Sequence, residues 1–224
     1  LGVIGEAAAA TIAGSVLSAC GAGDSVEAGA RGDEGDELDS DTNAWGPADD
    51  GQTLLGPGPW TLAAFEFDAY HGRDGLGNLL TWAAGNGLGS GDDSNYDGYA
   101  NSRFTIAVTA INHYGEQSYY AEPGANILVA ALSNGVDEGI TTTVLTGTGG
   151  YNSSGNVTLT SGRTSRATPP ADGVIELMLE AIETLTWMTV RNFLVNSPRM
   201  NHPSDSSMAY NGAGTYTPHQ NRLG

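Results

Sequence analysis

Three kinds of residue in this sequence could carry chemistry: a hydroxyl pair before a helix, an amide between glycines, and aspartates in loops. The segments are Gly162-Arg163-Thr164-Ser165, Gly85-Asn86-Gly87, and Asp49, Asp92, Asp93 and Asp97. Hydroxyls can act as nucleophiles, amides as hydrogen-bond donors, and carboxylates as ligands of cations. Each also has a simpler interpretation, as helix caps, a tight turn and solvated loop acids. Because each segment allows both a chemical and a structural interpretation, the order of the segments along the chain must decide between them.

The composition excludes some classes of function. The chain has 26 acidic and 8 basic residues, all of the latter arginine, for a net charge of -18. Nucleic-acid binding is disfavoured because phosphates need a positive face. The acidity indicates either a solvated acidic surface, which we favour, or a groove that attracts basic ligands. Cys20 is the only cysteine, so no intrachain disulfide can form. No apolar stretch reaches the ~20 residues of a membrane span.

The elements that must position these residues alternate between helices and strands. With 224 residues and 33 glycines, one α/β domain over 1–224 fits best. Continuous apolar runs predict buried strands of a mostly parallel sheet, with helices on both faces. An acidic, glycine-rich segment, 22–42, predicts a flexible loop. The expected helices are 6–19, 61–71, 171–183 and 186–195, with Thr184 and Thr186 as candidate caps, and the expected strands are 78–83, 104–111, 126–132 and 141–146.

Ordered motifs then give the sequence a family resemblance. NAWGPADDG (43–51), GPGP (56–59), GRDG (72–75), WAAGNG (82–87), NYDGYANS (95–102) and YAE (120–122) follow one another. Together they resemble the kexin/furin branch of the subtilisin-like serine peptidases, and the resemblance runs from about residue 43 to residue 219. Many matches in one order are far more specific than any single motif.

The resemblance implies roles for single residues. Ser165 matches the catalytic nucleophile, with Pro169 on the proline that follows it. Asn86 matches the oxyanion-hole asparagine, whose amide stabilises the tetrahedral intermediate. Asp49 and Asp97 match carboxylates that select arginine or lysine before the cleaved bond, by charge-assisted hydrogen bonds. The substrate-binding segments also include Trp45, Gly46 and Ala83. The implied partners are proteins or peptides with basic residues.

A calcium site is implied next to the specificity pocket. Asp49, Asp92 and Glu122 match the family's calcium ligands, and backbone carbonyls and waters would complete the six to eight oxygens that calcium prefers. The ion would offset the repulsion among these carboxylates. The family is secreted or faces the secretory lumen, so the same location is expected for this protein.

The catalytic base is the missing part of the pattern. The family's histidine precedes a Gly-Glu-Ala-Ala segment by a few residues, and Gly5-Glu6 lies almost at the start of this sequence. We therefore expect the histidine, and the aspartate that orients it, upstream of Leu1, and an incomplete N-terminal part of the fold. None of the four histidines (His71, His113, His202 and His219) has the context of a base.

Other departures concern the nucleophile helix and the substrate side. Arg163 replaces a glycine, Arg166 an alanine, and Asp172 a small residue, so that charges enter a helix that the family buries. Leu55 stands where relatives often place an acid. An active endopeptidase and an inactive remnant that binds calcium and basic peptides both remain open. A chain that does not fold stably by itself, because a sheet edge is left unpaired, is a third possibility.

Overall fold

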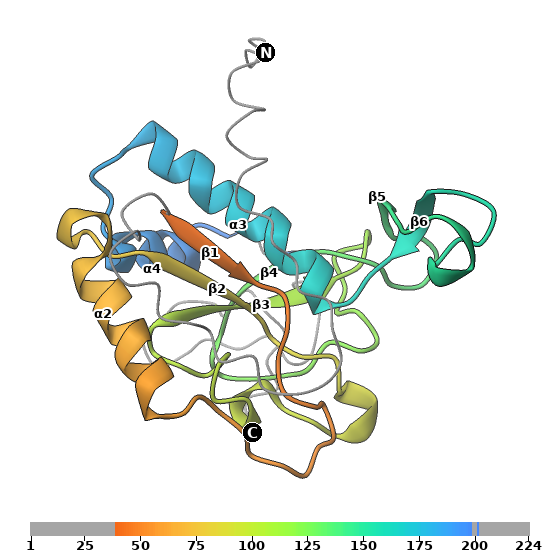
Figure 1. Cartoon of the computed structure of the whole chain (residues 1–224), viewed down its shortest axis with the longest axis horizontal. Coiled ribbons are helices and arrows are strands. Elements are labelled where there is room, and N and C mark those ends of the chain that lie inside the picture. The colour runs from red at the N-terminus through yellow and green to blue at the C-terminus, as the bar shows by residue number, and fades with distance from the viewer. Residues whose placement is uncertain (1–38, 199–200, 202–224) are drawn as a thin grey trace.

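The computed structural model describes residues 39–198 and 201 as an α/β fold (Figure 1). Four parallel strands form the central sheet in the order β1-β2-β3-β4, and two antiparallel strands form a second, small sheet. The helices are α2 (Pro59–Gly75), α3 (Thr164–Ala181) and α4 (Trp187–Asn196). The strands are β1 (Ser40–Asn43), β2 (Leu79–Ala83), β3 (Thr105–Ile111), β4 (Ile127–Leu132), β5 (Ile140–Thr143) and β6 (Val157–Ser161).

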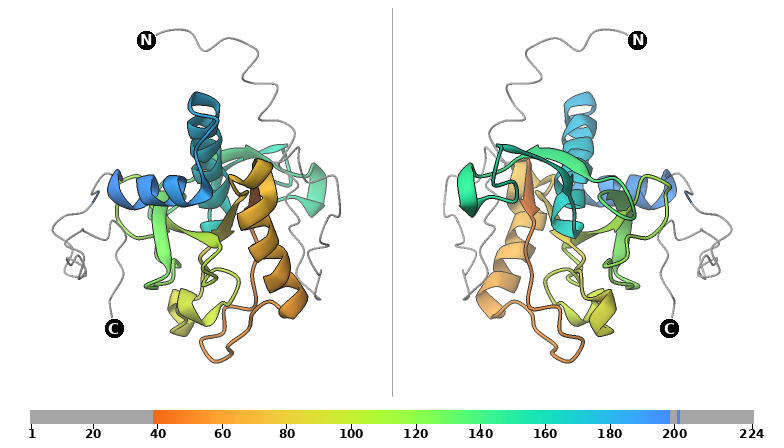
Figure 2. Two further views of the ribbon diagram at one scale, coloured as in Figure 1. Left: turned by 90° about the vertical axis from the view of Figure 1, so that its left-hand side faces the viewer. Right: turned by 90° about the vertical axis from the view of Figure 1, so that its right-hand side faces the viewer.

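The two central strands are buried along their whole length, which confirms the interpretation of their apolar runs. Successive side chains of a strand point to opposite faces. Ile106, Val108 and Ala110 of β3 belong to the larger core cluster, which also contains Ile175 of α3 and Val190 of α4. The sheet therefore has one face covered by these two helices, and Figure 2 shows α3 standing across it.

The opposite face of the sheet carries a smaller, aromatic core. Trp82 of β2 stacks on Tyr99 and makes edge contacts with Trp45 and with Phe65 of α2, with ring centroids 4.9–5.7 Å apart. Such pairs contribute about 0.5–1.5 kcal/mol each beyond their buried area. Helices thus cover both faces of a parallel sheet, and the predicted fold class is confirmed.

Several boundaries differ from the sequence expectation. The sequence predicted a loop over the whole of 22–42, but the last residues of this range are in a strand. Ser40–Asn43 pairs with β2 in parallel register. The helix expected from 171 begins at Thr164, so that Pro169 and Pro170 lie inside it. Of the two candidate caps, Thr186 caps α4 by accepting a hydrogen bond from the amide of Thr189, and Thr184 does not cap it. Strand β6 was not predicted. The expected helix 6–19, most of the 22–42 segment, His202 and His219 lie outside the described residues.

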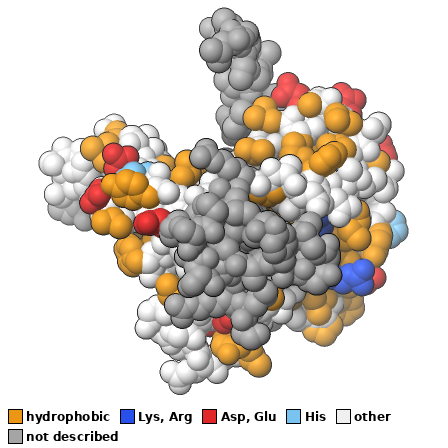
Figure 3. Space-filling model, turned by 180° about the vertical axis from the view of Figure 1, so that it is seen from behind, with side chains coloured by type: hydrophobic (Ala, Val, Ile, Leu, Met, Phe, Trp, Pro, Cys, Tyr) orange, Lys and Arg blue, Asp and Glu red, His pale blue; other side chains and the backbone are white. Residues whose placement is uncertain are grey.

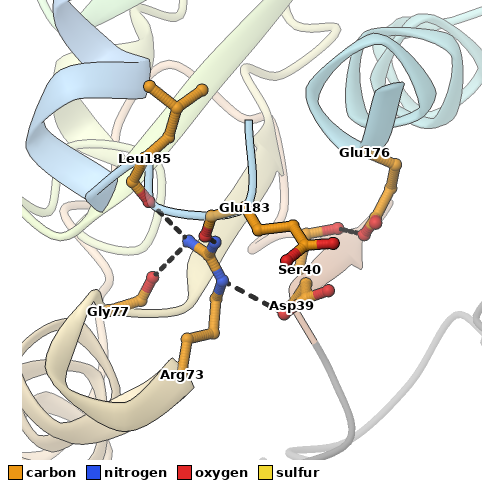
Figure 4. A network of polar contacts seen from close by, with 7 residues as sticks. All are labelled: Asp39, Ser40, Arg73, Gly77, Glu176, Glu183 and Leu185. Atoms are coloured by element: carbon orange, nitrogen blue, oxygen red, sulfur yellow. Dashed lines mark hydrogen bonds and ion pairs between the residues drawn. The ribbon is translucent and has the colours of Figure 1, made fainter. Parts of the chain in front are cut away.

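Arg73 joins three segments at the edge of the sheet (Figure 4). Its guanidinium donates to the carbonyls of Gly77, Glu183 and Leu185 at 3.0–3.3 Å and forms an ion pair with Asp39 at 3.1 Å. The regular part of α2 ends at Gly72, whose ψ of 154° is not helical, and Arg73 follows with φ +50° and its side chain directed toward the α3–α4 loop. The Arg73 side chain is only 6% exposed, so its donors need partners within the protein. The planar guanidinium reaches several acceptors at once, which the single ammonium group of a lysine would not do.

Acidic side chains lie at several places on the described surface seen in Figure 3, whereas basic ones are confined to its right side. This distribution agrees with the composition of 26 acidic and 8 basic residues.

No helix among the described residues is long and apolar enough to span a bilayer. The β5–β6 sheet projects away from the body of the molecule in Figure 1.

Asp172 is a buried carboxylate between α3 and the sheet. It accepts hydrogen bonds from the hydroxyls of Ser40 (3.2 Å), Thr42 and Thr81 (3.3 Å). Loss of hydration raises the pKa of Asp172 to about 6, and the nearby Glu176 adds to this, although the hydroxyl hydrogen bonds act in the opposite direction. The expected buried charge on this helix is therefore paired with hydroxyls and not with a cation.

Because Asp172 is buried, its ionisation should make the free energy of unfolding depend on pH. Asp172→Asn should remove this dependence. A carboxyl pKa raised from 3.8 to about 6 means that the folded state prefers the protonated acid, so stability is lost as pH rises from about 4 to about 6. The variant should match the wild type near pH 4 and exceed it by roughly 2–3 kcal/mol at pH 7. Urea unfolding across this range measures the difference, with Glu180→Gln on the same helix as the control. A difference that does not change with pH would contradict the prediction.

Candidate active site

The site lies beyond the carboxyl ends of the parallel strands, where ligands usually bind in open α/β sheets. Strand β2 ends at Ala83 and is followed by the predicted Gly85-Asn86-Gly87 turn. Helix α3 begins beside this glycine turn, because Asn86 bonds to Thr164, the first residue of the helix. Ser165 is the next residue of α3.

Asn86 links the turn to the start of α3. Its Oδ1 accepts hydrogen bonds from the backbone amide (2.9 Å) and the hydroxyl (3.0 Å) of Thr164. Its own backbone amide donates to Asp49 at 2.9 Å, and its Nδ2 lies 3.4 Å from the same carboxylate oxygen. The structure thus brings together Asn86 and the residue next to Ser165, as the resemblance requires. Sequence reasoning missed Thr164 as the partner of Asn86.

The calcium ligands proposed from sequence converge behind this turn. One carboxylate oxygen from each of Asp49, Asp92 and Glu122 lies within 4.8 Å of the others, and Asp92 and Glu122 are buried. Backbone amides hold them in place: Glu122 accepts from Gly87 at 2.7 Å and Asp92 from Gly51 at 3.0 Å. The structure describes no arginine paired with any of the three.

Two glycines of the turn are required by this packing. A Cβ on Gly85 would lie 2.4 Å from the carboxylate of Glu122, and Gly85 has φ +105°. A Cβ on Gly87 would lie 2.7 Å from the Cβ of Asp92 and 2.8 Å from that of Asp49. The turn therefore lies directly against the carboxylates, and no side chain other than hydrogen fits there.

The electrostatics of the cluster show uncompensated negative charge. Loss of hydration raises the pKa of Glu122 to about 8, and repulsion from Asp49, Asp92 and Asp97 adds to this rise. Burial likewise raises the pKa of Asp97 to about 6, with further repulsion from Asp49 and Asp92. A bound cation would relieve this repulsion, and three carboxylates form a hard, all-oxygen donor set. The residues present therefore fit calcium.

Asp97 lines the same pocket as the three carboxylates of the cluster. The residues that line the pocket are Pro47, Ala48, Asp49, Thr53, Gly85, Asp92, Tyr96, Asp97 and Glu122. Oδ1 of Asp97 accepts from the amide of Tyr99 at 2.7 Å, and its Oδ2 lies beside Gly46, where a Cβ would be 3.1 Å away. Of the remaining residues expected to bind substrate, Ala83 is buried at the end of β2, and Trp45 is part of the aromatic core.

The start of α3 is strained at Arg163. This residue has φ +88° and ψ 163°, a region that glycine occupies readily and other residues do not. Two hydrogen bonds fix it: its amide donates to the hydroxyl of Tyr120 at 2.8 Å, and its carbonyl accepts from Ser133 at 2.9 Å. Sequence reasoning noted the loss of a glycine here but attributed the problem to charge. The Arg166 side chain is half-buried.

Among the described residues, no histidine forms a hydrogen bond with Ser165. His71 is exposed and stacks on Phe67 in α2, and His113 packs against Tyr114 in the loop after β3. This agrees with the sequence interpretation of both as surface residues.

Comparison with known proteins shows the family to which this α/β fold belongs. Residues 2–214 match the peptidase S8 family model, described as the subtilase family. The chain is 37% identical over 202 residues to "PC3-like endoprotease variant B" of Hydra vulgaris, and 38% identical over 200 residues to proprotein convertase subtilisin/kexin type 6 of Rattus norvegicus. These alignments cover 88% of this chain and 27% and 20% of the relatives. The chain belongs to the subtilase family, and its curated relatives include proprotein convertases.

Solved structures support the fold alone. The serine protease of Aeromonas sobria in complex with its chaperone matches with a TM-score of 0.65 at 19% identity, over 80% of this chain and 37% of that protein. The free form of that protease gives the same TM-score at 20% identity. The chain spans about a quarter of the length of the curated relatives it matches and somewhat over a third of these structures.

The strain at Arg163 gives a prediction for Arg163→Gly. Removing the side chain should relieve about 1–3 kcal/mol of backbone strain, and the flexibility of glycine in the unfolded chain should offset about 0.5–1 kcal/mol of the gain. We expect a net rise in unfolding free energy, measured by urea denaturation. The matched control, Arg166→Gly, lies at an ordinary helical position and should destabilise by about 1 kcal/mol. Equal destabilisation by both substitutions would refute the strain.

Proposed function

We propose that this chain provides the substrate-binding and nucleophile side of a kexin/furin-type serine endopeptidase that cleaves proteins after basic residues. The observation that carries the proposal is the hydrogen bonding of Asn86 to the start of the Ser165 helix, next to a pocket lined by buried carboxylates. In this arrangement, hydrolysis, recognition of a basic side chain and binding of a cation all converge at the carboxyl ends of the strands.

Ser165 is the nucleophile in this proposal. It lies in the first turn of α3, where backbone amides have no partner within the helix and point toward a ligand. Attack by Oγ forms a bond to the carbonyl carbon of the substrate and places a negative charge on its oxygen. Asn86 Nδ2 carries two hydrogens, and only one can be directed to Asp49, so the other serves that oxygen. A donor of this kind contributes about 2.7–4 kcal/mol in subtilisin, a member of the same family.

A histidine must take the proton of Ser165, and the described residues do not supply it. The proposal requires such a base together with its orienting acid. An inactive relative that only binds calcium and basic peptides is the second candidate, favoured by the strained Arg163 beside Ser165. A fluorophosphonate probe separates the two candidates. Labelling that is lost in Ser165→Ala supports the enzyme and contradicts the second candidate. Because the base is not among the described residues, the second candidate is supported only if a chain extended to include the expected histidine binds arginine peptides and is still not labelled.

Asp97 and Asp49 bind the basic side chain in this proposal. Arginine in the pocket would donate charge-assisted hydrogen bonds to carboxylates that have few other donors. Asp92 and Glu122 would hold calcium with Asp49, and the ion supplies the positive charge that keeps the cluster ionised and fixes the turn of Asn86. Secretion is proposed through the family alone, since proprotein convertases act in the secretory pathway.

Recognition of the basic side chain predicts discrimination between arginine and citrulline, its neutral isostere. In fluorescence anisotropy with uncleaved peptides, the arginine peptide should bind about 10- to 100-fold more tightly, from roughly 1.5–3 kcal/mol of charged hydrogen bonding. Asp97→Asn should reduce this ratio to below about threefold, while Asp137→Asn, an exposed acid outside the pocket, should leave it unchanged. Equal affinity of the wild type for both peptides would reject the proposed specificity.

Calcium binding predicts a rise in the unfolding midpoint. With free calcium at 100 times its Kd, the folded state gains about 2.7 kcal/mol, which corresponds to roughly 5–10 °C in a chain of this size. Asp92→Asn should remove most of the shift, and magnesium should give a smaller one. Because the pKa of Glu122 is about 8, calcium must displace its proton, so the apparent affinity should increase as pH rises from 6.5 to 8.5. Identical midpoints in calcium and chelator would exclude the site.

A further inference from the structure

The β5–β6 hairpin (residues 139–162) differs in composition from the rest of the molecule. It contains no aspartate, glutamate, arginine or lysine, although the whole chain carries a net charge of -18. It also exposes large apolar side chains, with exposed fractions of 75% for Leu145, 82% for Tyr151 and 66% for Leu159. Among the described residues its two strands pair only with each other. Neither charge nor packing therefore protects this projection (Figure 1) from association with other chains.

Two acceptor motifs for N-linked glycans lie in this hairpin. Asn152-Ser153-Ser154 and Asn156-Val157-Thr158 have the pattern Asn-x-Ser/Thr, in which x is not proline. No other asparagine of the 224 residues is followed two positions later by a serine or a threonine. Such short motifs also arise by chance, so the surroundings of each asparagine must decide which one can carry a glycan.

Asn152 uses its carboxamide to close the turn of the hairpin. Its Oδ1 accepts hydrogen bonds from the amide and the hydroxyl of Ser154, both at 3.1 Å, and its Nδ2 donates to the carbonyl of Val157 at 2.8 Å. Gly155 lies against the same nitrogen, because a Cβ at this position would be 2.9 Å from it. The nitrogen to which a glycan would be joined is thus enclosed, and Asn152 has a structural role in the turn.

Asn156 has the opposite surroundings. It is exposed, and its side chain forms no hydrogen bond with any other residue that the structure describes. Its backbone carbonyl accepts a hydrogen bond from the amide of Val144 at 2.9 Å, so the residue is held at the start of β6 while its carboxamide remains free. The hydroxyl that the motif requires belongs to Thr158, within β6. Of the two asparagines, Asn156 is therefore the one that a glycan can join without breaking the turn.

We propose that Asn156 is an N-glycosylation site and that its glycan shields the exposed apolar side chains of the hairpin. A bulky hydrophilic group there supplies the solubility that charged residues supply elsewhere on this acidic chain. In the reaction, Nδ2 of Asn156 attacks the anomeric carbon of an oligosaccharide linked to a polyprenyl diphosphate. The new N–C bond replaces the bond from that carbon to the diphosphate, the polyprenyl diphosphate leaves, and Nδ2 loses one proton. The inference rests on the secretory location within the proposed function, because this transfer takes place in the secretory lumen.

Production in cultured mammalian cells tests the site. The 224-residue chain is directed to the secretory pathway by a cleavable signal peptide, and its mass is measured before and after treatment with a peptide N-glycosidase. We expect a single glycan, whose release converts Asn156 to aspartate, and mass spectrometry locates this change. Asn156→Gln and Thr158→Val should lose the glycan, whereas Thr158→Ser, which keeps the hydroxyl, should retain it. The glycan is added during synthesis, so the total cell-associated and secreted chain is analysed, and a variant that folds poorly still gives a result.

The matched controls are Asn152→Gln, which removes the other motif, and Thr160→Val, which changes a threonine of β6 outside both motifs. Both should keep the glycan. An unmodified wild type, a glycan found only at Asn152, or an unchanged mass in Thr158→Val would overturn the site. Release of the glycan from the folded chain should also increase self-association in sedimentation experiments, and equal association before and after release would overturn the shielding role.

Binding of arginine and citrulline peptides to the same preparation separates this inference from the proposed function. Discrimination between the peptides by a chain without a glycan would reject the glycosylation site and leave the proposed function. A glycan at Asn156 on a chain that does not discriminate would leave the site and reject the proposed specificity.

Discussion

The constraint on which the site depends is the packing of three carboxylates against a turn of the backbone. Asp49, Asp92 and Glu122 converge within 4.8 Å, and no described side chain of opposite charge joins them. Backbone amides satisfy part of their hydrogen bonding, which orients the carboxylates but does not cancel their charge. The turn must therefore approach closely, and Gly85 and Gly87 are glycine because the carboxylates occupy the space of a side chain.

The strands could be predicted from sequence because their burial leaves a direct pattern. β2 and β3 are continuous apolar runs, as parallel strands covered on both faces must be. The apolar run of β4 also predicted a strand, but the prediction that it is buried on both faces is wrong, because β4 lies at the edge of the sheet and is only partly buried after Ile127. β1 left no such pattern: Ser40–Asn43 is polar and follows an acidic segment, and its hydroxyls face Asp172 instead of an apolar core. A strand whose buried partner is a carboxylate cannot be found by searching for hydrophobic residues.

The start of α3 shows a second limit of sequence reasoning. Pro169 and Pro170 suggested that the helix begins after them, since proline lacks the amide that an internal turn needs. The helix instead begins at Thr164, because Asn86 accepts the first amide and so supplies the cap that Arg163 cannot. The pairing of Asn86 with Thr164 spans 78 residues, and such a contact is visible only in three dimensions. Ordered motifs suggested roles for Ser165 and Asn86, whereas the proximity of Asn86 to the start of the helix that carries Ser165 is seen only in this contact.

Asn86 also explains why the carboxylate cluster and α3 cannot be considered separately. Its backbone amide bonds to Asp49, and its side-chain oxygen bonds to Thr164, so one residue spans from the carboxylate cluster to the turn that holds Ser165. A displacement of Asp49 would therefore be transmitted through Asn86 to the first amide of α3. A cation among the carboxylates would then act on catalysis without touching the substrate, by fixing the position of Asn86. Acidic recognition and hydrolysis would thus share one set of charges, with the metal holding those charges in place.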